Sequence, residues 1–215
     1  KYVEGKVTHK LLILANKADS ILLNSKDTDI FSVAVNGEKI NTFEKTPNFL
    51  TIHFGRYYTH GQEISVSIDY IATPKLGCYF VQPDSAYPRK HFQAWTQGEQ
   101  MDNQHWVPIY DYPNDKATFE CIITVDNPFV AVSNGALISE SKLNGKHRFH
   151  WKESFPMVSY LISFVVGEYQ QINEEKNPVS ISYWVYPEHD RYDALRSFGD
   201  TPEMLTVFND YTGFS

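Results

Sequence analysis

The sequence predicts an all-β domain, built as an antiparallel saddle-like or sandwich arrangement with one short C-terminal helix. Three observations predict this fold class. Apolar and polar residues alternate along most of the chain, tight-turn dipeptides separate the alternating stretches, and no helical pattern lies between them. Apolar residues make up 42% of the 215 residues, which is enough for a sizeable core, while the 21% of charged residues argues against disorder.

The first expected strands show a period of two residues. In residues 31–35, Phe31, Val33 and Val35 are the apolar positions, and Asn36-Gly37 follows as the positive-φ pair of a tight hairpin. Residues 50–54 and 64–70 alternate in the same way, the second with one polar face. These stretches predict half-buried strands.

The later strands follow the same rule. Residues 117–125 form the longest alternation, and Asn134-Gly135 and Asn144-Gly145 predict two further hairpins. Residues 160–166 are apolar on both faces, which predicts a central strand, and residues 179–185 close the series. Residues 82–114 are polar, aromatic and irregular, so we expect long ordered loops of the kind that carry function.

The C-terminal tail changes to a helical period. Thr201 is expected to cap the helix, Pro202 suits its first turn, and Gly213 ends it. Its apolar stripe consists of Met204, Leu205, Phe208 and Tyr211. We therefore divide the chain into a β-rich domain at 1–198 and a helix at 199–215. We expect the chain to be part of a longer protein and some of this stripe to be exposed.

Charge and hydropathy exclude several classes of partner. The net charge of −7 argues against nucleic acid and anionic membranes as partners. No apolar run approaches the roughly 18 residues that a membrane span requires. Cys78 and Cys121 lie in apolar surroundings, so buried free thiols are expected rather than a disulfide. The cellular location stays open between the cytoplasm and export.

The chain contains no complete catalytic set. It has eight histidines, but no His-Glu-x-x-His, no Cys-x-x-Cys, no Gly-x-Ser-x-Gly and no phosphate-binding loop. Glu188-His189-Asp190 is interpreted as a solvated turn. We expect the chain alone to bind no zinc and to hydrolyse no aminoacyl-anilide.

Gln97 and Glu99 are the candidate binding residues. Their spacing of two places both side chains on one face of an extended stretch, a carboxylate beside an amide. Such a pair can hold an ammonium group, the carboxylate by its charge and the amide oxygen by a hydrogen bond. The alternative is a polar strand edge that faces water, and the spacing alone favours this alternative.

Several motifs in order resemble the N-terminal domain of the gluzincin zinc aminopeptidases, the family of aminopeptidase N and leukotriene A4 hydrolase. The resemblance covers nearly the whole chain, although Ile109 stands where the family usually has Cys. The matching motifs are Gly77-x-Tyr79-Phe80, Thr96-Gln97-Gly98-Glu99, Pro108-x-x-Asp111-x-Pro113-x-x-Lys116, Val132-Ser133-Asn134-Gly135, Tyr160-Leu161-Ile162-Ser163 and Val166-Gly167-Glu168-Tyr169.

This resemblance implies the N-terminal domain of an enzyme that releases single residues from peptides with a free N-terminus. Zinc and the catalytic residues would lie in a following thermolysin-like domain, outside this chain, so no metal ligand or catalytic residue is assigned here. By the resemblance, Glu99 would bind the substrate α-ammonium, and Gln97 would lie beside it. Asp111, Pro113 and Lys116 would shape the loop.

Two alternatives from other classes remain. One is a non-catalytic scaffold that keeps the fold of these enzymes without their zinc motif. The other is a carbohydrate- or protein-binding β module, in which tryptophans offer stacking platforms. The four tryptophans are Trp95, Trp106, Trp151 and Trp184.

Overall fold

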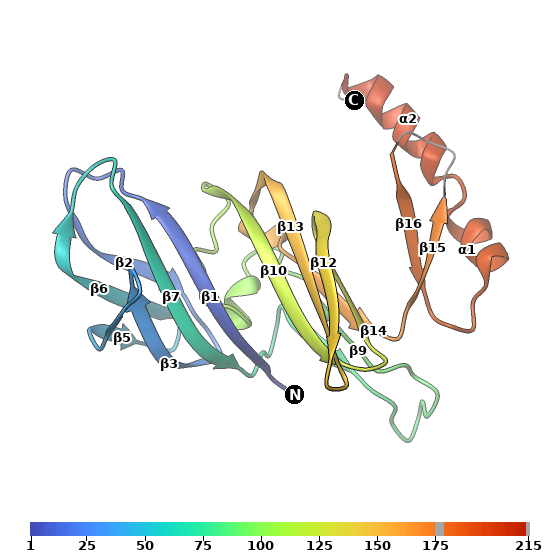
Figure 1. Ribbon diagram of the computed structural model, residues 1–215, viewed down its shortest axis with the longest axis horizontal. Coiled ribbons are helices and arrows are strands. Elements are labelled where there is room, and N and C mark those ends of the chain that lie inside the picture. The colour runs from blue at the N-terminus through green and yellow to red at the C-terminus, as the bar shows by residue number, and fades with distance from the viewer. Residues whose placement is uncertain (175–178, 214–215) are drawn as a thin grey trace.

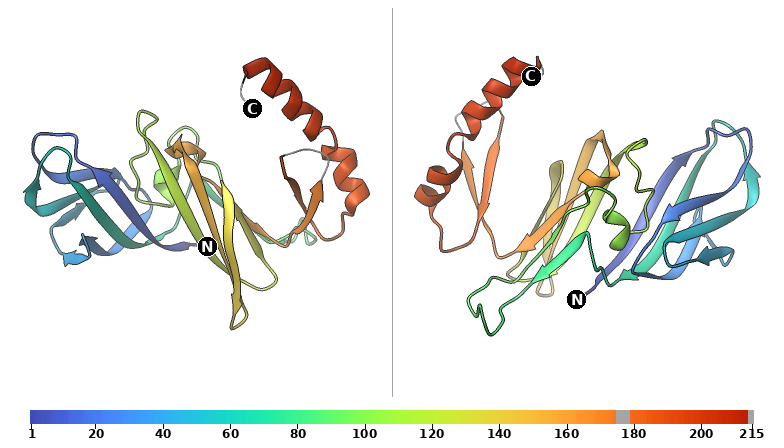
Figure 2. Two further views of the ribbon diagram at one scale, coloured as in Figure 1. Left: turned by 45° about the horizontal axis from the view of Figure 1, so that its top comes forward. Right: turned by 180° about the vertical axis from the view of Figure 1, so that it is seen from behind.

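The computed structural model describes residues 1–174 and 179–213, and it confirms an all-β fold of antiparallel sheets with a helical C-terminal end. An N-terminal sandwich lies at one end of the molecule, a pair of sheets lies in the middle, and a hairpin with two helices lies at the other end (Figure 1). The two views in Figure 2 show the same order from other sides. No helix among the described residues is long and apolar enough to cross a membrane.

The N-terminal sandwich packs two antiparallel sheets. One has the order β1 (Val3–Leu12), β7 (Glu63–Ala72), β3 (Thr28–Val35), β4 (Glu38–Ile40); the other has β2 (Ala18–Asn24), β6 (Phe49–Tyr58), β5 (Phe43–Lys45). Leu50, Ile52, Ile68 and Val33 are fully buried between them, as the alternation predicts. Phe31 is an exception, since its side chain is 60% exposed. A β-bulge between Ile30 and Ser32 turns it outward.

The middle of the molecule also consists of two sheets. The first has the order β10 (Lys116–Asp126), β13 (Lys146–Val158), β12 (Ala136–Leu143); the second has β11 (Val130–Ser133), β14 (Phe164–Gly167), β9 (Gln93–Thr96), β8 (Cys78–Val81). Ala131, Phe149 and Trp151 form the buried core between them. The Trp151 indole N–H donates to the Ala131 carbonyl at 2.9 Å, which satisfies its buried polar atom.

Two of the three Asn-Gly turns are hairpins. Asn36 and Asn144 have positive φ, and each turn joins two paired strands, β3–β4 and β12–β13. The hairpin predicted at Asn134-Gly135 is wrong, because this turn joins β11 to β12, which belong to different sheets. The Asn134 side chain accepts a hydrogen bond from the Ser163 amide at 2.8 Å, so a tertiary contact fixes the turn.

The central strand predicted at 160–166 is only partly correct. β14 is central, but it begins at Phe164, and a 3₁₀ turn, η2 (Ser159–Leu161), precedes it. The Ser159 carbonyl accepts hydrogen bonds from the Ile162 amide and from the Asn103 side chain. It is therefore not available for a strand ladder.

The C-terminal module comprises β15 (Gln170–Glu174), β16 (Ile181–Val185), α1 (Arg191–Phe198) and α2 (Thr201–Thr212). Its core contains Ile181, Tyr183 and Ala194, with Leu205 packed against them. α1 was not predicted; Asp190 caps it by accepting a hydrogen bond from the Asp193 amide at 3.0 Å.

The second helix is close to the prediction at both ends. Asp200 rather than Thr201 occupies the N-cap position of α2, and Thr201 lies inside its first turn. Gly213 ends the helix at a φ of 68°, as predicted. The last two positions of the predicted 199–215 segment lie outside the described residues, and within 179–185 the strand begins only at Ile181.

Candidate functional site

The loop that follows β9 carries both candidate residues. The Gln97 amide donates to the Gly77 carbonyl at 2.9 Å, which extends the β8–β9 pairing by one residue. Glu99 lies in a turn in which the Asp102 amide donates to the Gly98 carbonyl at 2.8 Å. The side chains of Gln97 and Glu99 are exposed, whereas Gly98 between them is buried. The extended backbone assumed in the sequence argument therefore reaches Gln97 and ends before Glu99.

Two glycines allow this loop to pack closely. A Cβ atom at Gly98 would lie 2.6 Å from the side-chain amide of Asn103. At Gly77 it would lie 1.9 Å from the Asp102 carbonyl oxygen, and φ is +74° there. Any other residue at either position would push the loop away from its support.

Asn103 is the support beneath the loop, in the 3₁₀ turn η1 (Asn103–His105). Its side chain is fully buried and makes three hydrogen bonds. It donates to the Ser159 carbonyl at 2.7 Å and the Ile162 carbonyl at 3.1 Å, and accepts from the Trp106 indole N–H at 2.8 Å. Because the bonds to Ser159 and Trp106 are buried, replacing Asn103 with an apolar residue would leave both of these partners unsatisfied.

Asp111 is a second buried polar residue behind the loop. Its carboxylate accepts hydrogen bonds from the Ser159 hydroxyl at 2.9 Å and the Gln104 amide at 3.0 Å. Its own amide donates to the Asn24 side chain at 3.1 Å. Burial raises the pKa of the Asp111 carboxyl, although both hydrogen bonds to it favour the ionised form. These contacts shape the loop from behind and leave no oxygen of Asp111 exposed to a substrate.

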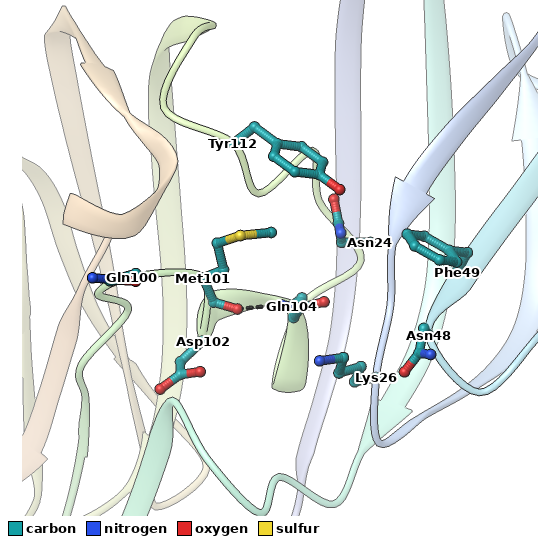
Figure 3. Close-up of a pocket in the computed structure, with 9 residues that line it drawn as sticks. All are labelled: Asn24, Lys26, Asn48, Phe49, Gln100, Met101, Asp102, Gln104 and Tyr112. Atoms are coloured by element: carbon teal, nitrogen blue, oxygen red, sulfur yellow. Dashed lines mark hydrogen bonds between the residues drawn. The ribbon is translucent and has the colours of Figure 1, made fainter.

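An open cavity of about 460 Å³ adjoins the loop. Figure 3 shows Gln100 and Met101 of the loop on one side and Asn48 and Phe49 of the sandwich on the other. The remaining lining residues are Asn24, Lys26, Asp102, Gln104 and Tyr112. Side-chain amides dominate this lining, so the surface beside Glu99 is polar.

The described residues contain no group of three or more His, Cys, Asp and Glu side chains that could hold a metal ion. Histidines instead pair singly with carboxylates, for example His105 with Asp27 at 2.6 Å. Cys78 and Cys121 are free, and burial raises the pKa of the Cys78 thiol to about 12. No sequence pattern indicated the pairing of His105 with Asp27 or of His91 with Glu188, because their members are 78 and 97 residues apart in the chain.

Taken together, these features define a β-sheet domain that presents a rigidly supported polar loop and, in its described part, no metal centre. The Peptidase M1 N-terminal domain family matches residues 1–161. The chain therefore belongs to this family, as the motifs around Gln97 and Glu99 indicated.

Relatives in sequence are peptidases and a hydrolase. Leukotriene A-4 hydrolase from Xenopus laevis is 27% identical over 213 residues, which cover 93% of this chain and 34% of that protein. Aminopeptidase M1 from Arabidopsis thaliana is 28% identical over 183 residues, covering 84% of this chain and 20% of that protein. The chain thus spans about a third or less of these two relatives.

Solved structures share the fold. The M1 zinc metallopeptidase from Deinococcus radiodurans superposes with a TM-score of 0.81 over 97% of this chain and 49% of that chain, at 19% identity. The sandwich, the middle sheets and the C-terminal module therefore share the fold of about half of that peptidase chain.

Proposed function

We propose that the chain is the N-terminal domain of a zinc-dependent aminopeptidase and that it recognises the N-terminus of the peptide substrate. The observation that carries this proposal is the exposed pair Gln97 and Glu99, on a loop held by buried Asn103, within a member of the Peptidase M1 N-terminal domain family. Family membership and the zinc metallopeptidase relatives support the parent activity.

Zinc would be held by other residues of the whole protein. In such a peptidase, zinc activates a water and polarises a carbonyl. The described residues offer no set of ligands that could hold the zinc for this chemistry. The isolated chain is accordingly proposed to be inactive. Residues 199–215 would lead into a separate catalytic domain.

The role of this chain is to bind and orient the substrate amine. The Glu99 carboxylate attracts the α-ammonium, and the Gln97 amide oxygen accepts a hydrogen bond from it or lies beside the first side chain. Only an unblocked N-terminus brings a positive charge to this loop. Selectivity for free N-termini then follows from the charge of Glu99.

Replacing Glu99 with Gln in the whole enzyme tests this proposal. The change keeps the shape and removes a charge-assisted hydrogen bond, whose contribution is roughly 1.5–3 kcal/mol, so kcat/KM should fall about 10- to 150-fold. A peptide amine loses its proton near pH 8, approximately, so the wild type should lose affinity above that pH and the variant should lose less. Steady-state kinetics on an unblocked peptide measure both effects.

Glu38→Gln is the matched control, since Glu38 is an exposed carboxylate in the N-terminal sandwich. It should leave kcat/KM unchanged. If Glu99→Gln also stays within about twofold of the wild type, the ammonium-binding role is wrong.

The carbohydrate-binding alternative gains no support from Trp95, Trp106 or Trp151. Trp106 and Trp151 are 7% and 8% exposed and belong to the core. Trp95 stacks on Tyr79 with ring centroids 4.5 Å apart. Their faces are used for internal packing rather than offered as a platform.

A further inference from the structure

One face of β9 runs from the C-terminal module to the candidate site. Gln93 pairs with Gly167 and Trp95 with Val165, so these two side chains share a face of the sheet. Gln97 follows at the same two-residue interval and is still paired with β8 through the Gly77 carbonyl. The strand that presents Gln97 at one end therefore begins, at its other end, next to the C-terminal module.

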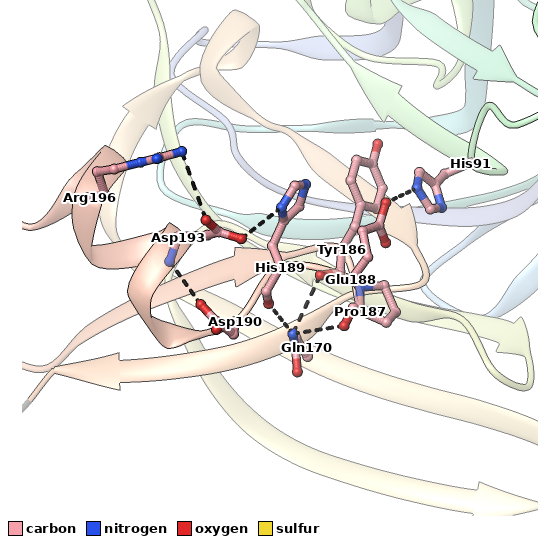
Figure 4. A network of polar contacts seen from close by, with 9 residues as sticks. All are labelled: His91, Gln170, Tyr186, Pro187, Glu188, His189, Asp190, Asp193 and Arg196. Carbon is pink, nitrogen blue, oxygen red and sulfur yellow. Dashed lines mark hydrogen bonds and ion pairs between the residues drawn. The ribbon is translucent and has the colours of Figure 1, made fainter.

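His91, just before β9, contacts the module directly (Figure 4). Its Nε2 atom lies 2.7 Å from a Glu188 carboxylate oxygen. Its ring stacks on the Tyr186 ring, with centroids 3.8 Å apart and planes 14° from parallel. The ion pair is half exposed and by itself contributes little, but the stacked ring fixes its geometry.

Gln93 makes the second contact. Its side-chain oxygen accepts hydrogen bonds from the Tyr169 hydroxyl at 3.2 Å and the Tyr186 hydroxyl at 3.1 Å. Burial raises the pKa of Tyr169 to about 12, so this phenol stays protonated at neutral pH. A Cβ atom at Gly167 would lie 2.6 Å from the Tyr169 ring, so the link between β14 and β15 also packs closely.

The turn that carries Glu188 is held within the C-terminal module by hydrogen bonds from Gln170. The Gln170 side chain donates to the Tyr186 and Pro187 carbonyls at 3.4 Å and also to the His189 carbonyl. The next residue, Asp190, caps α1. The sequence predicts a solvated turn at Glu188-His189-Asp190; these residues are exposed, but Glu188 also contacts His91.

We propose that His91 and Gln93 form a latch that docks the C-terminal module on β9 and thereby positions Gln97 and Glu99. The docking follows from the contacts above, while its effect on substrate binding rests on the proposed function. His91 and Gln93 are positioning residues and touch no substrate themselves. Because only a short link joins β14 to β15, the latch sets the orientation of β9 relative to the C-terminal module.

Trypsin provides a test of docking on the 215-residue chain. Arg89 and Lys90 are cleavage sites next to His91, and Glu188→Ala removes the partner of His91 without altering the sequence around them. We expect cleavage after Lys90 to accelerate about three- to fivefold in Glu188→Ala, the upper range for a pair of this exposure. Glu188→Gln keeps an oxygen that can accept from His91 and should restore the rate to within twofold of the wild type.

Glu120→Ala is the matched control, because Glu120 pairs with His150 at 2.8 Å on the sheet of β10 and β13. It removes a His–carboxylate pair of the same kind, together with the ion pair of Glu120 with Lys152 at 3.1 Å, and should leave cleavage after Lys90 unchanged. An unchanged rate in Glu188→Ala, or an equal acceleration in Glu120→Ala, would overturn the latch.

The positioning role is tested in the whole enzyme. Since Gln97 and Glu99 are proposed to hold the amine in ground and transition states alike, Glu188→Ala should raise KM for an unblocked peptide about fivefold and leave kcat within twofold. An unchanged KM, with accelerated proteolysis, would overturn the positioning role. If proteolysis accelerates while Glu99→Gln leaves kcat/KM unchanged, the proposed function fails and the docking stands.

Discussion

Buried polar side chains help to hold the loop of Gln97 and Glu99 in place. Asn103 donates to the carbonyls of Ser159 and Ile162, and the Asp111 amide donates to the Asn24 side chain. The two residues thus link the loop to segments far apart in the chain. The motif resemblance predicted that Asp111 shapes the loop. It did not identify Asn103, because an amide in a polar, irregular stretch gives no sign of burial; the neighbouring Trp106, its hydrogen-bond donor, was the available clue.

His9 on β1 gives a prediction at the same scale. Its Nε2 atom lies 2.9 Å from the Pro108 carbonyl, so the neutral ring donates a hydrogen bond there. Burial lowers the pKa of His9, and the hydrogen bond to Pro108 offsets only part of this. Below about pH 6.5 the unfolded chain binds a proton that the folded chain resists, so stability should fall as pH decreases through that value.

His9→Gln keeps an N–H donor and cannot take up this proton, so its free energy of unfolding should fall less between pH 7.5 and pH 5. Urea unfolding at several pH values measures this difference. His60→Gln, at an exposed histidine, is the control and should follow the wild type. Equal pH dependence in the wild type and His9→Gln would contradict the prediction.

At the scale of elements, the sequence predicted the turns whose conformation depends only on neighbouring residues. The hairpins at Asn36 and Asn144 follow from residues that adopt positive φ. The turn at Asn134 and the late start of β14 at Phe164 depend on side chains from other elements, so the same pattern was misleading there. The short α1 escaped prediction because its buried apolar contact is mainly Ala194, and only the cap Asp190 marked it.

Gly77 and Gly61 separate two reasons for glycine at positive φ. Their φ angles are 74° and 82°, but only Gly77 faces a crowded backbone, since nothing lies within 4 Å of a Cβ atom at Gly61. Gly61→Ala should cost about 1–2 kcal/mol from backbone strain alone. Gly77→Ala should cost about 1–3 kcal/mol more, because the loop must move to admit a methyl group.

Urea unfolding of both variants measures this difference. Gly77→Ala should also lower kcat/KM of the whole enzyme, because Gly77 pairs with Gln97, whereas Gly61→Ala should not. Equal destabilisation by the two substitutions would show that the Asp102 carbonyl does not crowd a methyl group at residue 77.

At the scale of the whole molecule, the arrangement of the parts was beyond sequence reasoning. The sandwich, the middle sheets and the C-terminal module follow one another along the long axis (Figure 1). The latch that joins the last two depends on His91 and Glu188, which are 97 residues apart. Neither residue stands out by itself, and no local pattern pairs them.

The outer face of α2 is an apolar surface, as the sequence predicted. Met204 is 55% exposed and Phe208 63% exposed, while Leu205 of the same stripe packs on the module core. If the chain is the first part of a longer peptidase, as we propose, other residues of the whole protein would cover this face.

Phe208→Ala distinguishes a covered face from an open one. In the 215-residue chain an exposed ring contributes little, so the substitution should change the free energy of unfolding by no more than about 0.5 kcal/mol. In the whole protein a covered Phe208 should cost about 3–5 kcal/mol when truncated, because a cavity is left in its place. Asp210→Ala, at an exposed residue of the same helix, should have a small effect in both. A small effect of Phe208→Ala in the whole protein would mean that α2 remains uncovered there and that its apolar stripe has another role.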